Sequence, residues 1–149
     1  MFTQPCFIRK NTPEIRQKLE ELGYKPSYPI FQYPEVFKHI AACNFFGSKY
    51  YGVSDDEVSH HGEIKDAIKN RGMIDCETNE KLFFALAALR NDTDKNQWFI
   101  SNVDIFTECY NNEWKLYEDW CNIFTIEDLN SKIPPIRKAT VEEIIKYFK

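Results

Sequence analysis

The chain has 149 residues, of which 43% are apolar and 15% aromatic, and this composition predicts one domain with a packed core. The net charge of −4 gives no general attraction to phosphate backbones, so a nucleic-acid partner is not expected. No apolar run approaches the ~18 residues of a membrane span, and the N-terminus lacks the apolar run of a signal peptide. Five cysteines without a CxxC pair favour a reduced, cytoplasmic protein.

The N-terminal part predicts a strand followed by a capped helix. Residues 6–10 begin apolar and fit a short strand. Thr12 is a good N-cap, because its side-chain oxygen can accept a hydrogen bond from the first turn. Apolar residues recur at helical spacing over 13–22, and Gly23 is placed to end the helix.

The next part of the chain is richer in proline and aromatic residues. Residues 24–35 contain three prolines and fit an extended loop, with a short strand at 30–33. Residues 35–43 fit either a helix or the approach to a strand. Residues 44–53 predict a strand pair, or one bent strand, around Gly47.

The centre of the chain predicts a second strand and helix. Residues 54–72 are polar and fit a surface loop plus a short helix. A strand at 73–76 precedes Thr78, which we expect to cap a helix over 79–90. This helix is apolar on most faces, so it should be the most buried. A strand at 97–101 would complete a β-α-β unit.

The C-terminal part predicts a hairpin, two further strands and two helices. Residues 104–109 and 113–117 predict a hairpin that turns at Asn111-Asn112. A strand at 120–124 and a short helix at 125–129 follow. The chain then forms a strand at 136–138 and, after Thr140, a helix at 141–148. Together the elements predict a single α/β (α+β) domain, with a mixed sheet of about five strands packed by three main helices, 13–22, 79–90 and 141–148.

One short pattern occurs twice along the chain. Residues 8–14 read IRKNTPE and residues 136–142 read IRKATVE, with a looser copy at 74–80. A duplication would explain the repetition. Convergence on a good helix start would also explain it, because one cap contributes about 1 kcal/mol.

These strand–TxE–helix units, at 7–24, 72–99 and 136–148, resemble those of small uncharacterised proteins of Bacteroides-type bacteria and their phages. The resemblance implies a phage or mobile-element context. It implies no chemistry, because that group has no assigned active site.

The repeated helix starts carry a candidate anion site. Basic side chains beside the free N–H groups of a helix N-terminus can bind phosphate. The residues of this site are Arg9, Lys10, Thr12, Arg137, Lys138 and Thr140. If the two strands are neighbours, they would form one basic patch for a nucleotide-like ligand. Alternatively, the basic residues face solvent or pair with Glu14 and Glu142.

Two further sets of residues are weaker candidates for a functional site. Glu57, His60 and His61 combine a carboxylate with imidazoles, as a divalent-metal site or general base would. Their spacing matches no known metal or catalytic motif, and a solvated loop is the favoured explanation. An aromatic run could form a partner surface, or pack its loop onto the core. Its residues are Tyr24, Tyr28, Phe31 and Tyr33.

The sequence contains no catalytic motif, and no cofactor is expected. The leading hypothesis is a non-enzymatic cytoplasmic accessory protein of phage or mobile-element type, which binds another protein or itself; a host-defence or replication factor is a candidate partner. The alternatives are a nucleotide-binding or nucleotide-sequestering protein at the two helix starts, and a metal-dependent hydrolase at Glu57, His60 and His61.

Overall fold

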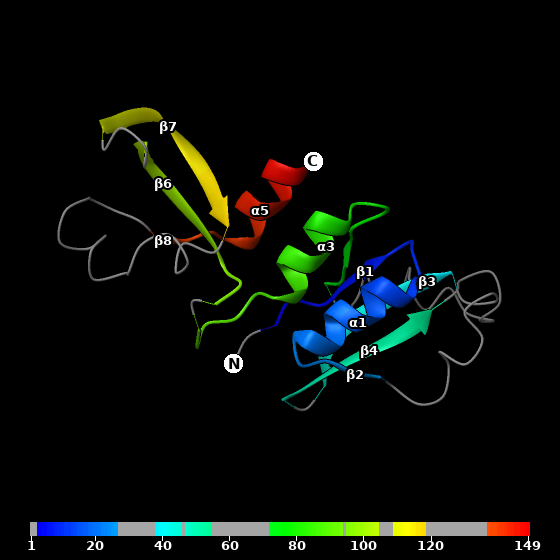
Figure 1. The fold of residues 1–149 in the computed structure, drawn as a ribbon. Helices are drawn as coiled ribbons and strands as arrows, with labels where there is room; N and C mark the ends of the chain where they lie inside the picture. The colour runs from blue at the N-terminus through cyan, green and yellow to red at the C-terminus, as the bar shows by residue number, and fades with distance from the viewer. Residues whose placement is uncertain are drawn as a thin grey trace. The chain divides into compact units, whose positions relative to one another are not determined.

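The computed structural model describes residues 3–26, 38–45, 47–54, 72–93, 95–104, 109–118 and 137–149 (Figure 1). The chain separates into two compact units, Met1–Ala88 and Leu89–Lys149. Each unit contains its own sheet, and each is described by itself below. Whether the chain behaves as the single domain predicted from its length stays a prediction.

The first unit is built on a mixed five-stranded sheet. Its elements are β1 (Cys6–Ile8), α1 (Pro13–Glu21), β2 (Lys25–Pro26), β3 (His39–Phe45), β4 (Ser48–Ser54), β5 (Ile74–Asp75) and α3 (Glu80–Ala87). The strand order is β2-β4-β3-β1-β5. The pairs β1–β3 and β3–β4 are antiparallel, whereas β1–β5 and β2–β4 are parallel. The predicted fold class, a mixed sheet of five strands with three helices, is confirmed.

Helix α1 begins and ends where the sequence predicts. The Thr12 side chain accepts a hydrogen bond from the Ile15 N–H at 3.3 Å, and Pro13 occupies the first helical position. Gly23 follows the helix at a φ of 94°, a left-handed conformation that glycine adopts without the strain of a Cβ atom. The helix is therefore fixed by signals within its own few residues.

The strands β3 and β4 form the predicted pair around Gly47. Phe45 pairs with Ser48, and the register continues to His39 and Ser54. Gly47 lies between them with a φ of 81°. Of the two alternatives open for residues 35–43, the approach to a strand fits the described part, 38–43, because β3 begins at His39.

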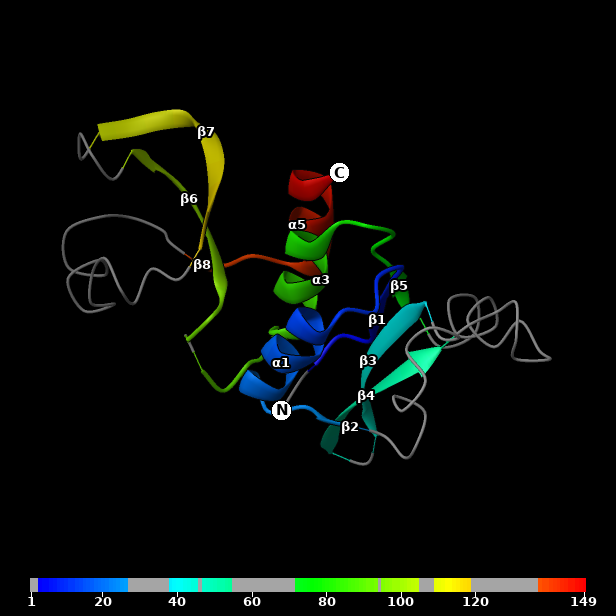
Figure 2. The same ribbon diagram turned by 45° about the vertical axis from the view of Figure 1, so that its right-hand side comes forward.

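Helices α1 and α3 cover the same face of the sheet. Residues opposite each other in neighbouring strands share a face, so the pairs Cys6↔Ala42 and Ala42↔Tyr51 place all three on one side. The Cys6 thiol contacts the Phe83 carbonyl of α3, and the Tyr51 hydroxyl donates to the Glu20 carboxylate of α1 at 2.7 Å. Figures 1 and 2 show α1 and α3 together on that side.

Helix α3 is the most buried of the described helices, as its apolar composition predicts. Its buried residues are Leu82, Phe83, Ala85, Leu86 and Ala87. The predicted cap is wrong by one residue. Thr78 lies in a turn after Glu77, which has a positive φ of 54°, and the Asn79 side chain accepts from the Leu82 N–H at 3.1 Å instead. The helix begins at Glu80, so the residue at the cap position is Asn79 and not Thr78.

Two of the three cysteines of this unit lie in its core. Cys6 and Cys76 are buried free thiols, and Cys43 is half-buried. Burial, followed by the neighbouring Cys76 thiol, raises the pKa of Cys6 well above its usual value. A thiol that stays protonated is a poor nucleophile, so Cys6 packs as a small apolar residue.

In the described part of the second unit there are a three-stranded sheet and one helix. Its elements are β6 (Trp98–Asp104), β7 (Cys109–Glu118), β8 (Arg137–Lys138) and α5 (Val141–Phe148). The order is β7-β6-β8, with both pairs antiparallel. Its buried apolar residues are Phe99, Ile100, Leu116, Ala139 and Ile144.

Two predictions for this region are wrong. The predicted β-α-β unit does not form, because β5 pairs with β1 and β6 pairs with strands of the other sheet. The predicted hairpin of 104–109 and 113–117 does not form, because β6 ends at Asp104 and pairs with β7 from Cys109 onwards. Ser101 pairs with Lys115 and Val103 with Tyr110, so β7 has residues 111–114 where β6 has only one. The two asparagines therefore lie in an irregularity within β7, because β6 continues to Asp104 before the chain reverses.

Several predicted elements lie outside the described residues. They are the strands at 30–33 and 120–124, the short helix before Gly72, and the helix at 125–129.

Candidate functional site

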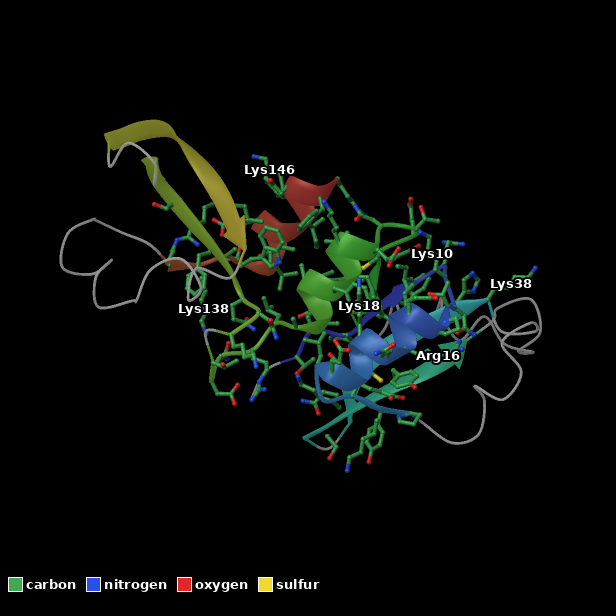
Figure 3. The ribbon with its side chains drawn as sticks, viewed as in Figure 1. Lys10, Arg16, Lys18, Lys38, Lys138 and Lys146 are labelled. Carbon is green, nitrogen blue, oxygen red and sulfur yellow. The ribbon has the colours of Figure 1, made fainter. Side chains whose placement is uncertain are left out.

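The basic residues before α1 are paired with acids from distant elements. The Arg9 guanidinium lies 3.0 Å from the Asp75 carboxylate at the end of β5. The Lys10 ammonium lies 3.3 Å from the Glu80 carboxylate at the start of α3 (Figure 3). These pairs are half exposed, so each is a surface ion pair that holds β1 to its neighbours.

The start of α5 is closed by its own carboxylate. Thr140 and Glu143 form a capping box: the Thr140 side chain accepts from the Glu143 N–H at 3.3 Å, and the Glu143 carboxylate accepts from the Thr140 N–H at 2.8 Å. Arg137 donates to both oxygens of the same carboxylate, at 2.9 and 2.6 Å. The hydrogen bonds from Arg137 are the main reason that the pKa of Glu143 falls to about 2.

The Lys138 side chain binds main-chain oxygens. Its ammonium donates to the carbonyl of Arg90 at 3.3 Å and to the carbonyl of Thr93. These carbonyls belong to the segment between α3 and β6, which Lys138 therefore ties to β8.

The six predicted anion-site residues are thus placed at two separate helix starts. β1 has β3 and β5 as its neighbours, whereas β8 pairs with β6, so the two strands are not adjacent in one sheet. Arg9 pairs with Asp75, Lys10 with Glu80 and Arg137 with Glu143. The sequence suggested Glu14 and Glu142 as the acidic partners. At α5, the anion expected at a helix N-terminus is the side chain of Glu143 itself.

One member of the predicted aromatic partner surface is a core residue. Tyr24 is 2% exposed, and its hydroxyl donates to the Ala87 carbonyl at 2.6 Å. Burial raises the pKa of this hydroxyl. Tyr24 is therefore unable to offer its ring to a partner. Tyr28, Phe31 and Tyr33 lie outside the described residues.

The metal candidates Glu57, His60 and His61 also lie outside the described residues. Across the described ranges, no group of three or more histidine, cysteine, aspartate or glutamate side chains is arranged to hold a metal ion. The hydrolase alternative stays a prediction.

A different aromatic cluster is exposed on the second unit. We call Trp98, Tyr147 and Phe148 the α5 aromatic surface. The Trp98 ring centroid lies 6.1 Å from that of Tyr147 and 5.1 Å from that of Phe148. Tyr147 is 58% exposed, whereas Trp98 and Phe148 are half-buried. Within the described residues, Tyr147 is the large apolar side chain that stands out as exposed.

This surface was not predicted from the sequence, although a signal for it is present there. Tyr147 follows the buried Ile144 by three positions, so helical spacing places it at the margin of the buried face. Its contact with Trp98, by contrast, depends on how β6 and α5 meet. Such a contact cannot be obtained from spacing along one helix.

No protein-family model, no curated protein and no solved structure matches this chain. Within the described part of the chain, no helix has the length and apolar character needed to cross a membrane.

Proposed function

We propose that this chain is a non-enzymatic cytoplasmic accessory protein of phage or mobile-element type that acts by binding another protein. The phage or mobile-element context rests on the resemblance of the strand–TxE–helix units at 7–24, 72–99 and 136–148. A host-defence or replication factor is the candidate partner, and a second copy of the chain is the first partner to test.

The exposed Tyr147 of the α5 aromatic surface is the observation that carries this proposal. Tyrosine and tryptophan are enriched at protein interfaces, because a large rigid ring buries much apolar area with little loss of side-chain freedom. Tyr147 contacts the rings of Trp98 and Phe148, and these contacts restrict its ring before a partner arrives. Contacts that already hold a side chain reduce the entropy lost on binding.

The basic residues favour this function over nucleotide binding. Arg9, Lys10 and Arg137 each contact a carboxylate, and Lys138 contacts two carbonyls. A phosphate would have to displace these groups or bind beside acids that repel it. The repeated basic pairs are therefore better explained as parts that stabilise the fold.

The test is partner capture with a Tyr147→Ser variant. The tagged wild-type protein is used to retain partners from lysate of a bacterial host, each retained protein is identified, and binding is measured again with both proteins purified. We expect Tyr147→Ser to weaken that binding by at least about tenfold, as the loss of a central interface aromatic does. Sedimentation of the purified wild-type protein tests a second copy as the partner.

Glu142→Ser is the matched control, because Glu142 is an exposed residue of the same helix. It should bind the partner as the wild type does. The proposal is wrong if Tyr147→Ser and Glu142→Ser bind equally, or if the wild type retains no partner and sediments as a monomer.

A further inference from the structure

We draw no further inference here: the strongest candidate, the outer edge of β7 at the end of the three-stranded sheet, is interrupted at residues 111–114, and among the described residues nothing shows which strand or partner covers it.

Discussion

The two helix starts that share the sequence Ile-Arg-Lys-x-Thr are held in different ways. Before α1, Arg9 and Lys10 reach acids that are 66 and 70 residues away along the chain. Before α5, Arg137 reaches Glu143, only 6 residues away. Both basic residues of the first start thus reach distant acids of its unit. At the second start the arginine pair is complete within one strand and one helix, and only Lys138 is shown to reach distant groups, carbonyls 45 and 48 residues away.

The third helical position explains much of this difference. At α1 that position is Ile15, whose N–H bonds the Thr12 cap but whose side chain is buried in the core. At α5 it is Glu143, whose carboxylate returns to the cap and also binds Arg137. The residue at this position therefore determines whether the arginine before the helix has a carboxylate within reach at the helix start. The shared pattern indicates a way of starting helices, and it does not by itself indicate a shared ligand.

The largest effect should come from Lys138, whose ammonium binds two main-chain carbonyls, whereas its counterpart Lys10 lies against the Glu80 carboxylate. Lys138→Met keeps much of the side chain but leaves the Arg90 and Thr93 carbonyls without its ammonium. We expect the free energy of unfolding to fall by about 2 kcal/mol, the cost of unsatisfied, partly buried polar groups. All three tryptophans lie in the second unit, so urea unfolding followed by tryptophan fluorescence measures this change.

Lys146→Met is the control for that measurement, because Lys146 is an exposed lysine on α5 (Figure 3). It should change stability by less than about 0.5 kcal/mol. Equal losses in the two variants would show that the Lys138 contacts contribute nothing specific.

The caps should have the next largest effect. Thr140→Ala removes the acceptor of the Glu143 N–H and should cost about 1 kcal/mol, whereas Thr140→Ser keeps the oxygen and should cost only a fraction of this. Thr12→Ala should cost a similar amount at α1. Since the first unit contains no tryptophan, circular dichroism is the probe for Thr12. A Thr140→Ala variant as stable as the wild type would contradict the capping box.

The success of the helix predictions has a physical reason. A cap and the N–H that donates to it lie three residues apart, so α1 and α5 could be predicted from neighbouring residues. The same locality explains the error at α3, where a turn at Glu77 shifts the cap from Thr78 to Asn79.

The sheets and the candidate sites were harder to predict because their contacts are distant in sequence. Nothing near β5 indicates that it pairs with β1 while β6 joins another sheet. Likewise, no local pattern reveals that Arg9 meets Asp75 or that Trp98 meets Tyr147. The basic residues were found by their chemistry, but their role depends on acids that only the fold brings to them.

The Arg137–Glu143 pair should make the stability of the second unit depend on pH. The folded pKa of Glu143 is lowered from 4.5 to about 2, so the folded state favours the charged carboxylate. This contribution is fully present above about pH 4.5 and is lost as the pH falls toward 2. Because the pair is partly exposed, we expect about 1 kcal/mol.

Glu143→Gln tests this dependence. The variant should be less stable than the wild type at pH 7, and the difference should shrink as the pH falls from about 4.5 to 2. Glu142→Gln serves as the control, because it neutralises the neighbouring acid and leaves the capping box intact. If the wild type and Glu143→Gln keep the same difference at every pH, the ion pair does not contribute through its charge.

The smallest effect should come from nucleotides, for which we expect no rise in melting temperature. A phosphate at either helix start would meet Asp75, Glu80 or Glu143, whose negative charges already neutralise the neighbouring cations. A thermal-shift series with nucleoside triphosphates at millimolar concentration tests this expectation. The double variant Arg9→Ala plus Arg137→Ala is measured in the same series as the matched control for the wild type. Stabilisation of the wild type that disappears in the double variant would show that ligands displace the internal carboxylates. Nucleotide binding would then replace protein binding as the better explanation of the repeated basic pairs.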